Sequence, residues 1–275
     1  MPTVWVACEA TEQVGLGHLS RCVAIAEELQ QNDVIVCFHH LTKLDSYGKK
    51  FLQTSNFQSN CVCNSDPNLV IVDDYNIRNL ESIILKSEVK RLQVVDETSP
   101  SYMADGYIQA SPIKKWQPAN IEAAIFEFKN NPILRRKFDA RIVNSSAVSA
   151  PLRILIVLGA ASVFAEICSK LLSAISNVEV PRIEKIAIYN PKQLSIRESD
   201  QFDFTLLTNN IDLEKIYPEF NFVISAAGVS AWELIAIGMP GFALGVSDNQ
   251  QLQLNYLIEN QIRIGVRYFN NNNFE

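Results

Sequence analysis

Residues 9–18, with the sequence EATEQVGLGH, contain the first side chains whose types and spacing suggest chemistry. Gly15 and Gly17 permit backbone conformations that other residues avoid, and they let a ligand approach the chain closely. His18 follows at the expected start of a helix, where the helix dipole favours the neutral imidazole that accepts a proton. The segment lacks the third glycine of a dinucleotide-binding fingerprint and the Gly-Lys-Ser/Thr of a Walker A loop. His18 is therefore either a general base or a residue that caps this turn.

Residues 225–234, SAAGVSAWEL, form the second segment of interest. A strand is expected to end at its small residues, and a helix is expected to begin at Gly228 or Val229. Free N–H groups at a helix start bind anions, and small residues leave room for a phosphate. Glu233 lies about one turn further along, where a carboxylate can reach a ribose diol. The alternative is a close-packed strand-to-helix turn that binds nothing.

Residues 247–251, SDNQQ, form a third candidate segment between a predicted strand and the last predicted helix. The amides of Asn249 and Gln250 suit sugar hydroxyls, because each amide offers both a donor and an acceptor. The same residues are equally consistent with a helix start at which Asp248 is the N-cap.

Acidic residues end two of the predicted strands. Asp73 and Asp74 end one strand, and Asp96 and Glu97 end another. Successive side chains of a strand point in opposite directions, so neighbouring carboxylates seldom bind the same metal ion. We expect most of them to cap the loops that follow.

Cysteine and histidine side chains are the other possible metal ligands. Their spacing matches no common zinc site, and Cys37 lies in an apolar run where a thiol behaves as a small buried hydrophobe. The sequence therefore predicts no metal site, and we expect all six cysteines to stay reduced. The residues considered are Cys37, His39, His40, Cys61 and Cys63.

The elements that must position these residues alternate between strands and helices, which predicts βαβ units and a parallel sheet. The small, polar residues 144–151 predict a linker between two βα domains, residues 1–148 and 149–275, with a ligand cleft between them. Strands are expected at residues 3–8, 33–38, 68–73, 91–96, 106–109, 152–158, 183–189, 220–225 and 241–246. Helices are expected at residues 18–31, 76–88, 164–176, 229–237 and 248–260.

Composition excludes several classes of protein. The 275 residues are 48% hydrophobic and 20% charged, which suits packed cores and argues against disorder. A net charge of −6 argues against a protein that binds nucleic acid or an anionic membrane. The sequence has no apolar run of the roughly 18–20 residues that span a membrane, and its start lacks a basic signal-peptide region. We expect a soluble cytoplasmic protein, either a monomer or a weak homodimer.

The motifs together resemble one known family. Residues 14–21, 225–234, 238–240 and 249–250 occur in the same order in the UDP-2,4-diacetamido-2,4,6-trideoxy-β-L-altropyranose hydrolases of pseudaminic acid biosynthesis. Those enzymes belong to the GT-B group, which includes the glycosyltransferase that forms lipid II. Asp73 and Tyr75 match the family's Asp-x-Tyr strand end, and residues 133–138 are similar to its Leu-Leu-Arg-x-x-Phe segment.

The resemblance implies an α/β, GT-B-like fold of two Rossmann-type βα domains that face each other across a cleft. The C-terminal domain would hold UDP, and the sugar would face the Gly-x-Gly-His loop. His18 would activate the water that attacks the anomeric carbon, with Tyr75 and Asn249 close to the sugar and the diphosphate. No metal or cofactor is implied. The implied substrate-binding residues are Gly15, Gly17, Arg21, Arg135, Ala227, Gly228, Val229, Ser230, Glu233 and Gln250.

The chain also departs from the family's pattern. Its loop begins with Glu9 and Ala10 in place of Asp-Ser, and the family's Gly-Gly-x-Asp becomes GAAS, with Ala160 and Ser162 at its second and fourth positions. Asn131 replaces a tyrosine, and Gln109 replaces an asparagine. The predicted function is that of a UDP-sugar hydrolase; the alternatives are a GT-B glycosyltransferase with a UDP-sugar donor and a nucleotide-sugar binding protein without turnover. The attached sugar does not follow from the sequence.

Overall fold

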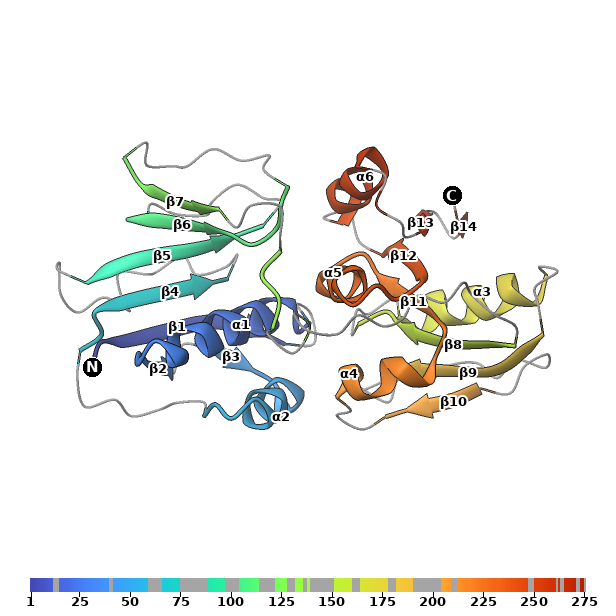
Figure 1. The fold of residues 1–275 in the computed structure, drawn as a ribbon, viewed down its shortest axis with the longest axis horizontal. Helices are drawn as coiled ribbons and strands as arrows, with labels where there is room; N and C mark the ends of the chain where they lie inside the picture. The colour runs from blue at the N-terminus through green and yellow to red at the C-terminus, as the bar shows by residue number, and fades with distance from the viewer. Residues whose placement is uncertain are drawn as a thin grey trace. The chain divides into compact units, whose positions relative to one another are not determined.

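The computed structural model contains two compact units, Met1–Arg136 (unit 1) and Lys137–Glu275 (unit 2) (Figure 1). The predicted boundary between residues 148 and 149 and all but the last residue of the predicted linker lie outside the described residues, so both stay predictions. The structure describes residues 1–11, 15–39, 42–58, 66–74, 89–96, 104–113, 122–127, 132–135, 138, 151–159, 164–177, 182–189, 204–208, 212–246, 250–260, 262, 265–270 and 273–274.

Unit 1 is built on a parallel sheet whose described strands have the order β2-β1-β4-β5-β6-β7, with β3 paired to β1 beside this path. The strands predicted in this half and the helix predicted at residues 18–31 are confirmed, whereas the helix predicted at residues 76–88 lies outside the described residues. The elements are β1 (Thr3–Ala10), α1 (Gly17–Gln31), β2 (Ile35–Phe38), β3 (Lys43–Leu44), α2 (Ser46–Thr54), β4 (Leu69–Asp73), β5 (Lys90–Val95), β6 (Gly106–Gln109) and β7 (Ala124–Glu127).

Helix α2 and strands β3 and β7 were not predicted. Strand β3 has only two residues and β7 has four, too short for a clear hydrophobic pattern. The sequence did contain a start signal for helix α2, which is Asp45. In the structure its side chain accepts a hydrogen bond from the backbone N–H of Gly48 at 2.7 Å. An aspartate in this position is a strong N-cap.

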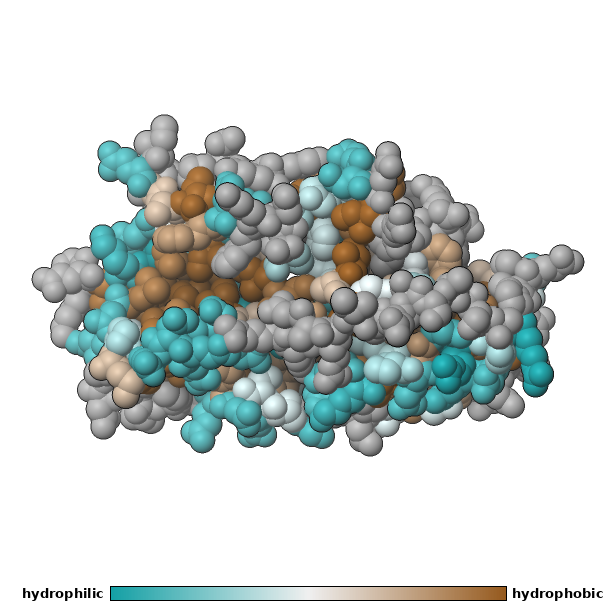
Figure 2. Space-filling model, viewed as in Figure 1, coloured by the Kyte–Doolittle hydropathy of each residue, from teal (hydrophilic) through white to brown (hydrophobic). Residues whose placement is uncertain are grey.

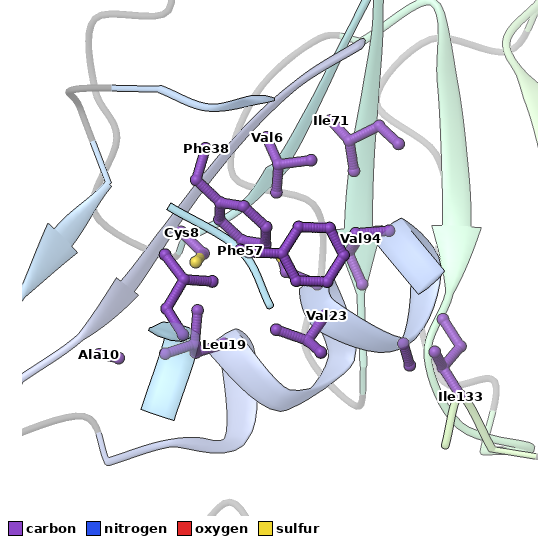
Figure 3. Packing of buried hydrophobic residues seen from close by; sticks show 14 of the residues in the cluster. Val6, Cys8, Ala10, Leu19, Val23, Phe38, Phe57, Ile71, Val94 and Ile133 are labelled. Carbon is purple, nitrogen blue, oxygen red and sulfur yellow. The ribbon is translucent and has the colours of Figure 1, made fainter. Parts of the chain in front are cut away.

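One face of α1 packs against the sheet and forms the core of unit 1 (Figure 3). Leu19 and Val23 lie among Val6, Ile71 and Val94, and all five side chains are buried. Burial of a side chain of this size stabilises a fold by roughly 1.5–3 kcal/mol. The apolar face therefore sets the orientation of α1 on the sheet, and with it the direction of the polar residues in its first turn.

Unit 2 has a second sheet whose described strands have the order β10-β9-β8-β11-β12-β13-β14, parallel except for the antiparallel pair β13–β14. The strands and helices predicted in this half are confirmed, except that the last helix begins at Gln251 with Gln250, and not Asp248, as its N-cap residue. The elements β10, α4, η3, β13 and β14 were not predicted. The elements are β8 (Leu152–Val157), α3 (Phe164–Ser176), β9 (Ile183–Tyr189), β10 (Phe204–Leu207), α4 (Leu213–Ile216), η3 (Tyr217–Glu219), β11 (Phe222–Ala226), α5 (Val229–Ala236), β12 (Gly241–Gly245), α6 (Gln251–Glu259), β13 (Gly265–Asn270) and β14 (Asn273–Phe274).

Two apolar clusters cover the two faces of the unit 2 sheet. Helix α3 packs on one face through residues such as Phe164 and Leu172. The other face packs against Leu234 of α5 and Tyr217 of η3. Because both faces are covered, the central strands are nearly continuous runs of hydrophobic residues, as expected for a parallel sheet.

Each sheet has one point at which the order of its strands reverses. In unit 1, β2 lies on one side of β1 and β4 lies on the other; in unit 2, β9 and β11 flank β8 in the same way. In open α/β sheets, ligands bind beyond the carboxyl ends of the strands at such points. These ends are Ala10 and Asp73 in unit 1 and Val157 and Ala226 in unit 2.

The described cysteines differ in redox state. Cys37 is in a disulfide bond, so the expectation that every cysteine is reduced is wrong for this residue. Cys8, Cys22 and Cys168 are free and buried.

Figure 2 shows hydrophobic residues gathered over strands β4 to β7 of unit 1. Within the described residues, no helix has the length and apolar character needed to span a membrane.

Candidate active site

His18 is the second residue of α1, directly after the glycine-containing turn. Gly15 has a φ of +80°, a conformation that side chains with a Cβ rarely adopt, and its N–H donates to the carbonyl of Thr11 at 2.8 Å. The helix then begins at Gly17, with the N–H of Ser20 bonded to the carbonyl of Leu16 at 2.8 Å. The predicted helix start at the Gly-x-Gly-His segment is therefore confirmed.

The imidazole of His18 contacts the end of strand β4. Its Nδ1 lies 2.5 Å from Oδ1 of Asp73 and 3.1 Å from the backbone oxygen of the same residue. Both side chains are buried, with 7% of the His18 side chain and 1% of the Asp73 side chain exposed. Because both oxygens accept hydrogen bonds, we assign the proton to Nδ1 and the lone pair of the neutral ring to Nε2. The donor Nη2 of Arg21 lies further away, 3.3 Å from Nδ1. This tautomer is the one that general-base histidines use when a carboxylate orients them.

Arg21 joins the same cluster from the next turn of α1. Its Nε donates to Oδ2 of Asp73 at 2.9 Å and its Nη2 donates to Oδ1 of Asp73 at 2.8 Å, which makes the pairing bidentate. Its Nη1 donates to Oδ2 of Asp96 at 2.8 Å. The guanidinium therefore lies between the carboxylates that end β4 and follow β5.

Asp73 is ionised at neutral pH. Burial by itself raises the pKa of this carboxyl, but the charges of Arg21 and His18 and their hydrogen bonds outweigh burial and lower the pKa from 3.8 to about 2. A charged Asp73 can pair with the imidazolium that forms when His18 takes up a proton. The cluster of His18, Asp73, Arg21 and Asp96 is therefore suited to general-base catalysis.

The two carboxylates of this cluster were missed by the sequence analysis, which expected them to cap loops. Both carboxylate oxygens of Asp73 bind His18 or Arg21, and Asp96 binds Arg21, so their main contacts are with α1. A signal was present: Asp73 lies two residues after Ile71, and alternate residues of a strand face the same side. Because Ile71 packs in the core against α1, Asp73 faces α1 as well.

Other predicted residues of unit 1 lie elsewhere or outside the described residues. The guanidinium of Arg135 stands over the ring of Phe51 in α2, 5.0 Å from its centroid. Gln109, at the end of β6, donates from Nε2 to the carbonyl of Ser111 at 2.7 Å. Tyr75 and Asn131 lie outside the described residues.

In unit 2, the predicted strand-to-helix turn is confirmed at the end of β11. Gly228 is the N-cap residue, and α5 begins at Val229, followed by Ser230. The backbone N–H groups of such a first turn lack partners within the helix. The preceding Ala227 is fully buried, with its N–H bonded to the carbonyl of Leu244 at 2.7 Å. The turn is thus close-packed at Ala227, next to β12, and the N–H groups of the first turn of α5 follow it.

Gln250 and Gln253 lie beside this turn. The Oε1 of Gln250 accepts from the N–H of Val246 at 2.9 Å, which directs the Nε2 end of the amide away from that bond. A Cβ added to Gly228 would lie 3.7 Å from this Nε2. Gln253 donates from Nε2 to the carbonyl of Gly228 at 3.0 Å. The predicted residues Gly228 and Gln250 are therefore neighbours, and an amide N–H group lies next to the start of α5.

The remaining predictions for unit 2 concern the ribose and the diphosphate. Glu233 is buried within α5, with 4% of the residue exposed. Asn249, Ala160 and Ser162 lie outside the described residues. Across the described part of the chain, no group of three or more His, Cys, Asp or Glu residues is placed to hold a metal ion.

Comparisons with known proteins place this architecture. No family model and no curated protein matches the chain. Among solved structures, MurG of Acinetobacter baumannii has a TM-score of 0.60 at 15% identity, over 98% of this chain and 86% of that one. The spinosyn rhamnosyltransferase SpnG complexed with thymidine diphosphate has a TM-score of 0.54 at 14% identity, over 97% and 86%. A UDP-N-acetylglucosamine 2-epimerase has a TM-score of 0.51 at 10% identity, over 98% and 84%.

At these identities the likeness concerns the fold. The two parallel sheets with their helices and the match over nearly the whole chain confirm the predicted fold class. The chain is an α/β protein with the GT-B-like architecture of two Rossmann-type units.

Proposed function

We propose that the chain is a metal-independent enzyme that hydrolyses a UDP-sugar. The products are UDP and a free sugar, which by the family resemblance is a 2,4-diacetamido-2,4,6-trideoxy hexose. The observation that carries this proposal is the contact of 2.5 Å between Nδ1 of His18 and Oδ1 of Asp73. It supports an oriented imidazole whose Nε2 accepts a proton from water.

In the proposed reaction, a water oxygen forms a bond to the anomeric carbon of the sugar. The bond between that carbon and the diphosphate oxygen breaks, and its electron pair leaves with UDP. Nε2 of His18 takes the proton that the water loses, and Asp73 stabilises the imidazolium. His18 returns this proton to solvent before the next turnover.

The negative charge that develops on the leaving diphosphate needs donors. The N–H groups of Val229 and Ser230 at the start of α5 and the Nε2 amide of Gln250 are the donors that we propose. Gly228 has no side chain that would separate a phosphate from these groups. Glu233 is proposed to contact the ribose, and Asn249 and Tyr75 the sugar and the diphosphate, as the family resemblance implies.

The solved structures with the same fold support a nucleoside diphosphate as the ligand. SpnG was crystallised with thymidine diphosphate, and the epimerase is named for UDP-N-acetylglucosamine. With the net charge of −6, this supports a small-molecule nucleotide sugar as the partner and argues against nucleic acid and anionic membranes. A cytoplasmic monomer or weak homodimer without a cofactor completes the proposal.

A glycosyltransferase is the second candidate, because SpnG is named a rhamnosyltransferase. The same His18 would then deprotonate an alcohol acceptor instead of water, and the diphosphate would leave in the same way. The two reactions differ in one observable: a hydrolase releases UDP without an alcohol acceptor, whereas a transferase requires one.

The test combines nucleotide binding with turnover. Melting curves with UDP, ADP and dTDP report whether the chain binds UDP selectively. UDP release from UDP-2,4-diacetamido sugars is then measured with and without alcohol acceptors. We expect selective stabilisation by UDP, and acceptor-independent release that falls roughly 100- to 10,000-fold in His18→Ala, the usual contribution of a general base.

Release that requires an alcohol identifies a transferase. Stabilisation by UDP without turnover of any sugar contradicts the hydrolase, and leaves a binding protein or a transferase whose acceptor is missing from the assay. A melting temperature that no nucleotide changes contradicts the nucleotide-sugar proposal altogether.

A further inference from the structure

We propose that Arg21 and Asp96 are positioning residues for His18: Asp96 holds the guanidinium of Arg21, and the guanidinium holds Asp73 against Nδ1 of the imidazole. Arg21 would then act through Asp73 and not as the substrate-binding residue that the family resemblance implies. The inference deepens the proposed function and rests on it only for its activity measurement.

The guanidinium of Arg21 makes three charge-assisted hydrogen bonds, at 2.8 and 2.9 Å to Asp73 and at 2.8 Å to Asp96. Its Nη2 also lies 3.3 Å from Nδ1 of His18, so the guanidinium contacts the imidazole directly as well as through Asp73. The Arg21 side chain is 9% exposed, and those of Asp73 and Asp96 are 1% and 8% exposed. A buried guanidinium with this many partners is fixed in its plane, because the bidentate pairing sets both its position and its rotation.

Asp96 gives Arg21 a second anchor on a different strand. Asp73 ends β4, whereas Asp96 follows β5, and β4 and β5 are neighbours in the sheet. Without Asp96, the guanidinium could follow any movement of the single carboxylate that it binds. With Asp96, Asp73 is held in place relative to two strands and α1. Asp73 in turn holds the ring of His18.

Among the residues that the structure describes, few other titratable groups face Asp73. Its register partner on β1 is Cys8, and the next residue of α1 after Arg21 is Cys22, whose thiol interacts with Cys8, Asp73 and Arg21. Burial raises the pKa of the Cys22 thiol well above its ordinary value, so this thiol stays neutral. Arg21 and His18 are therefore the described cations that determine the ionisation of Asp73.

The first test is independent of turnover. Protein labelled with ¹⁵N-histidine has three labelled residues, so the His18 side chain is assigned by its loss in His18→Gln. In the wild type we expect a downfield, exchange-protected Nδ1 proton and the Nδ1–H tautomer. Asp96→Asn keeps the shape but removes the charge, and Arg21→Lys keeps a charge that cannot bridge both carboxylates. In both variants we expect the NMR signal of the Nδ1 proton to lose intensity, because this proton exchanges with solvent more rapidly.

Arg91→Gln is the matched control. It breaks a second Arg–Asp pair of the same sheet, between Nε of Arg91 and Oδ2 of Asp105 at 3.0 Å, away from the four clustered residues. We expect Arg91→Gln to leave the His18 signals and the UDP release unchanged.

The second test uses activity. We expect kcat for UDP release to fall roughly 10- to 100-fold in Asp96→Asn and in Arg21→Lys, as for other residues that orient a functional histidine, with KM almost unchanged. The split between kcat and KM separates positioning from structure, because a purely structural role would lower the amount of folded enzyme and leave kcat per folded enzyme unchanged.

The outcomes separate the two proposals. Folded variants that keep the wild-type Nδ1 signal and the wild-type kcat overturn the positioning role. If Asp96→Asn and Arg21→Lys do not fold while Arg91→Gln does, the pair is structural, and the positioning role is overturned as well. If the Nδ1 signal changes as expected but no UDP-sugar is hydrolysed, the positioning inference stands and the proposed function fails.

Discussion

The imidazole of His18 and the carboxylate of Asp73 are in direct contact although 55 positions separate them in the chain. The fold brings the two residues together. Helix α1 provides the imidazole at its first turn, and β4 provides the carboxylate at its carboxyl end, where the order of the strands reverses. In unit 2, Gly228 and Gln250 are likewise brought together from the start of α5 and the start of α6.

Replacement of Asp73 by asparagine tests the orientation of the base. The amide keeps the size of the carboxylate, but its NH2 group can face His18 and favour the wrong tautomer. We expect kcat for UDP release to fall by up to roughly 10,000-fold, the effect of the same change in a Ser-His-Asp triad. Asp105→Asn removes a carboxylate that pairs with Arg91, and it should retain activity. Equal activities in the two variants would contradict a role of Asp73 in catalysis.

Acidification is expected to remove stability through Asp73. Burial alone raises the pKa of this carboxyl, but Arg21 and His18 lower it from 3.8 to about 2. A carboxyl whose pKa is lower in the folded state stabilises the fold above its unfolded pKa, and this contribution is lost as the pH falls from about 4 to about 2. The contribution is about 2 kcal/mol, since one pKa unit corresponds to roughly 1.4 kcal/mol. Urea unfolding at a series of pH values measures it.

The control for this measurement is Asp105→Asn. Burial also raises the pKa of Asp105, and Arg91 lowers it below its ordinary value, so both carboxylates act in the same direction. The side chain of Asp105 is 30% exposed, so solvent screens its interactions and its contribution is smaller. If Asp73→Asn unfolds with the pH dependence of the wild type, the assignment to Asp73 is wrong.

Gln250→Ala is expected to weaken the binding of UDP about tenfold without a large change in stability, because it removes one amide donor from the start of α5. Isothermal titration with UDP measures the change. Gln251→Ala is the control, since the Nε2 of Gln251 donates to Oδ1 of Asn255 at 2.8 Å within α6. A Kd for UDP that is the same in both variants would remove Gln250 from the diphosphate site.

Gly15→Ala is expected to lower the free energy of unfolding by about 1–2 kcal/mol, the cost of a Cβ in the left-handed region. The cost comes from conformation alone, because an added Cβ at Gly15 has nothing within 4 Å, whereas φ is +80°. Gly17→Ala is the matched control, since Gly17 starts α1 without a positive φ and alanine favours a helix. A free energy of unfolding in urea that is lower for Gly17→Ala than for Gly15→Ala would contradict this expectation.

The alternation of strands and helices was predictable because it depends on local hydrophobic patterns, as in β4 and α1. The positions of His18 and Gly228 were also predictable, since both follow a strand and begin a helix. The partners of His18 were not predicted. Asp73 and Asp96 meet α1 only because β1, β4 and β5 are neighbours in the sheet, and local patterns do not contain the order of strands. The alternating directions of side chains along β4 were the one available signal.

The closed pairing of the four side chains in unit 1 also limits how this chain can diverge. Loss of one partner from a buried ion pair costs roughly 3–5 kcal/mol, because the other charge is left without compensation. A substitution that removed the charge of Arg21 would take the guanidinium from both Asp73 and Asp96, whereas one that neutralised Asp73 would leave Arg21 paired with Asp96. In homologous chains we therefore expect substitutions at these positions to occur together. Covariation of the paired positions, more than invariance of any one of them, should mark this cluster.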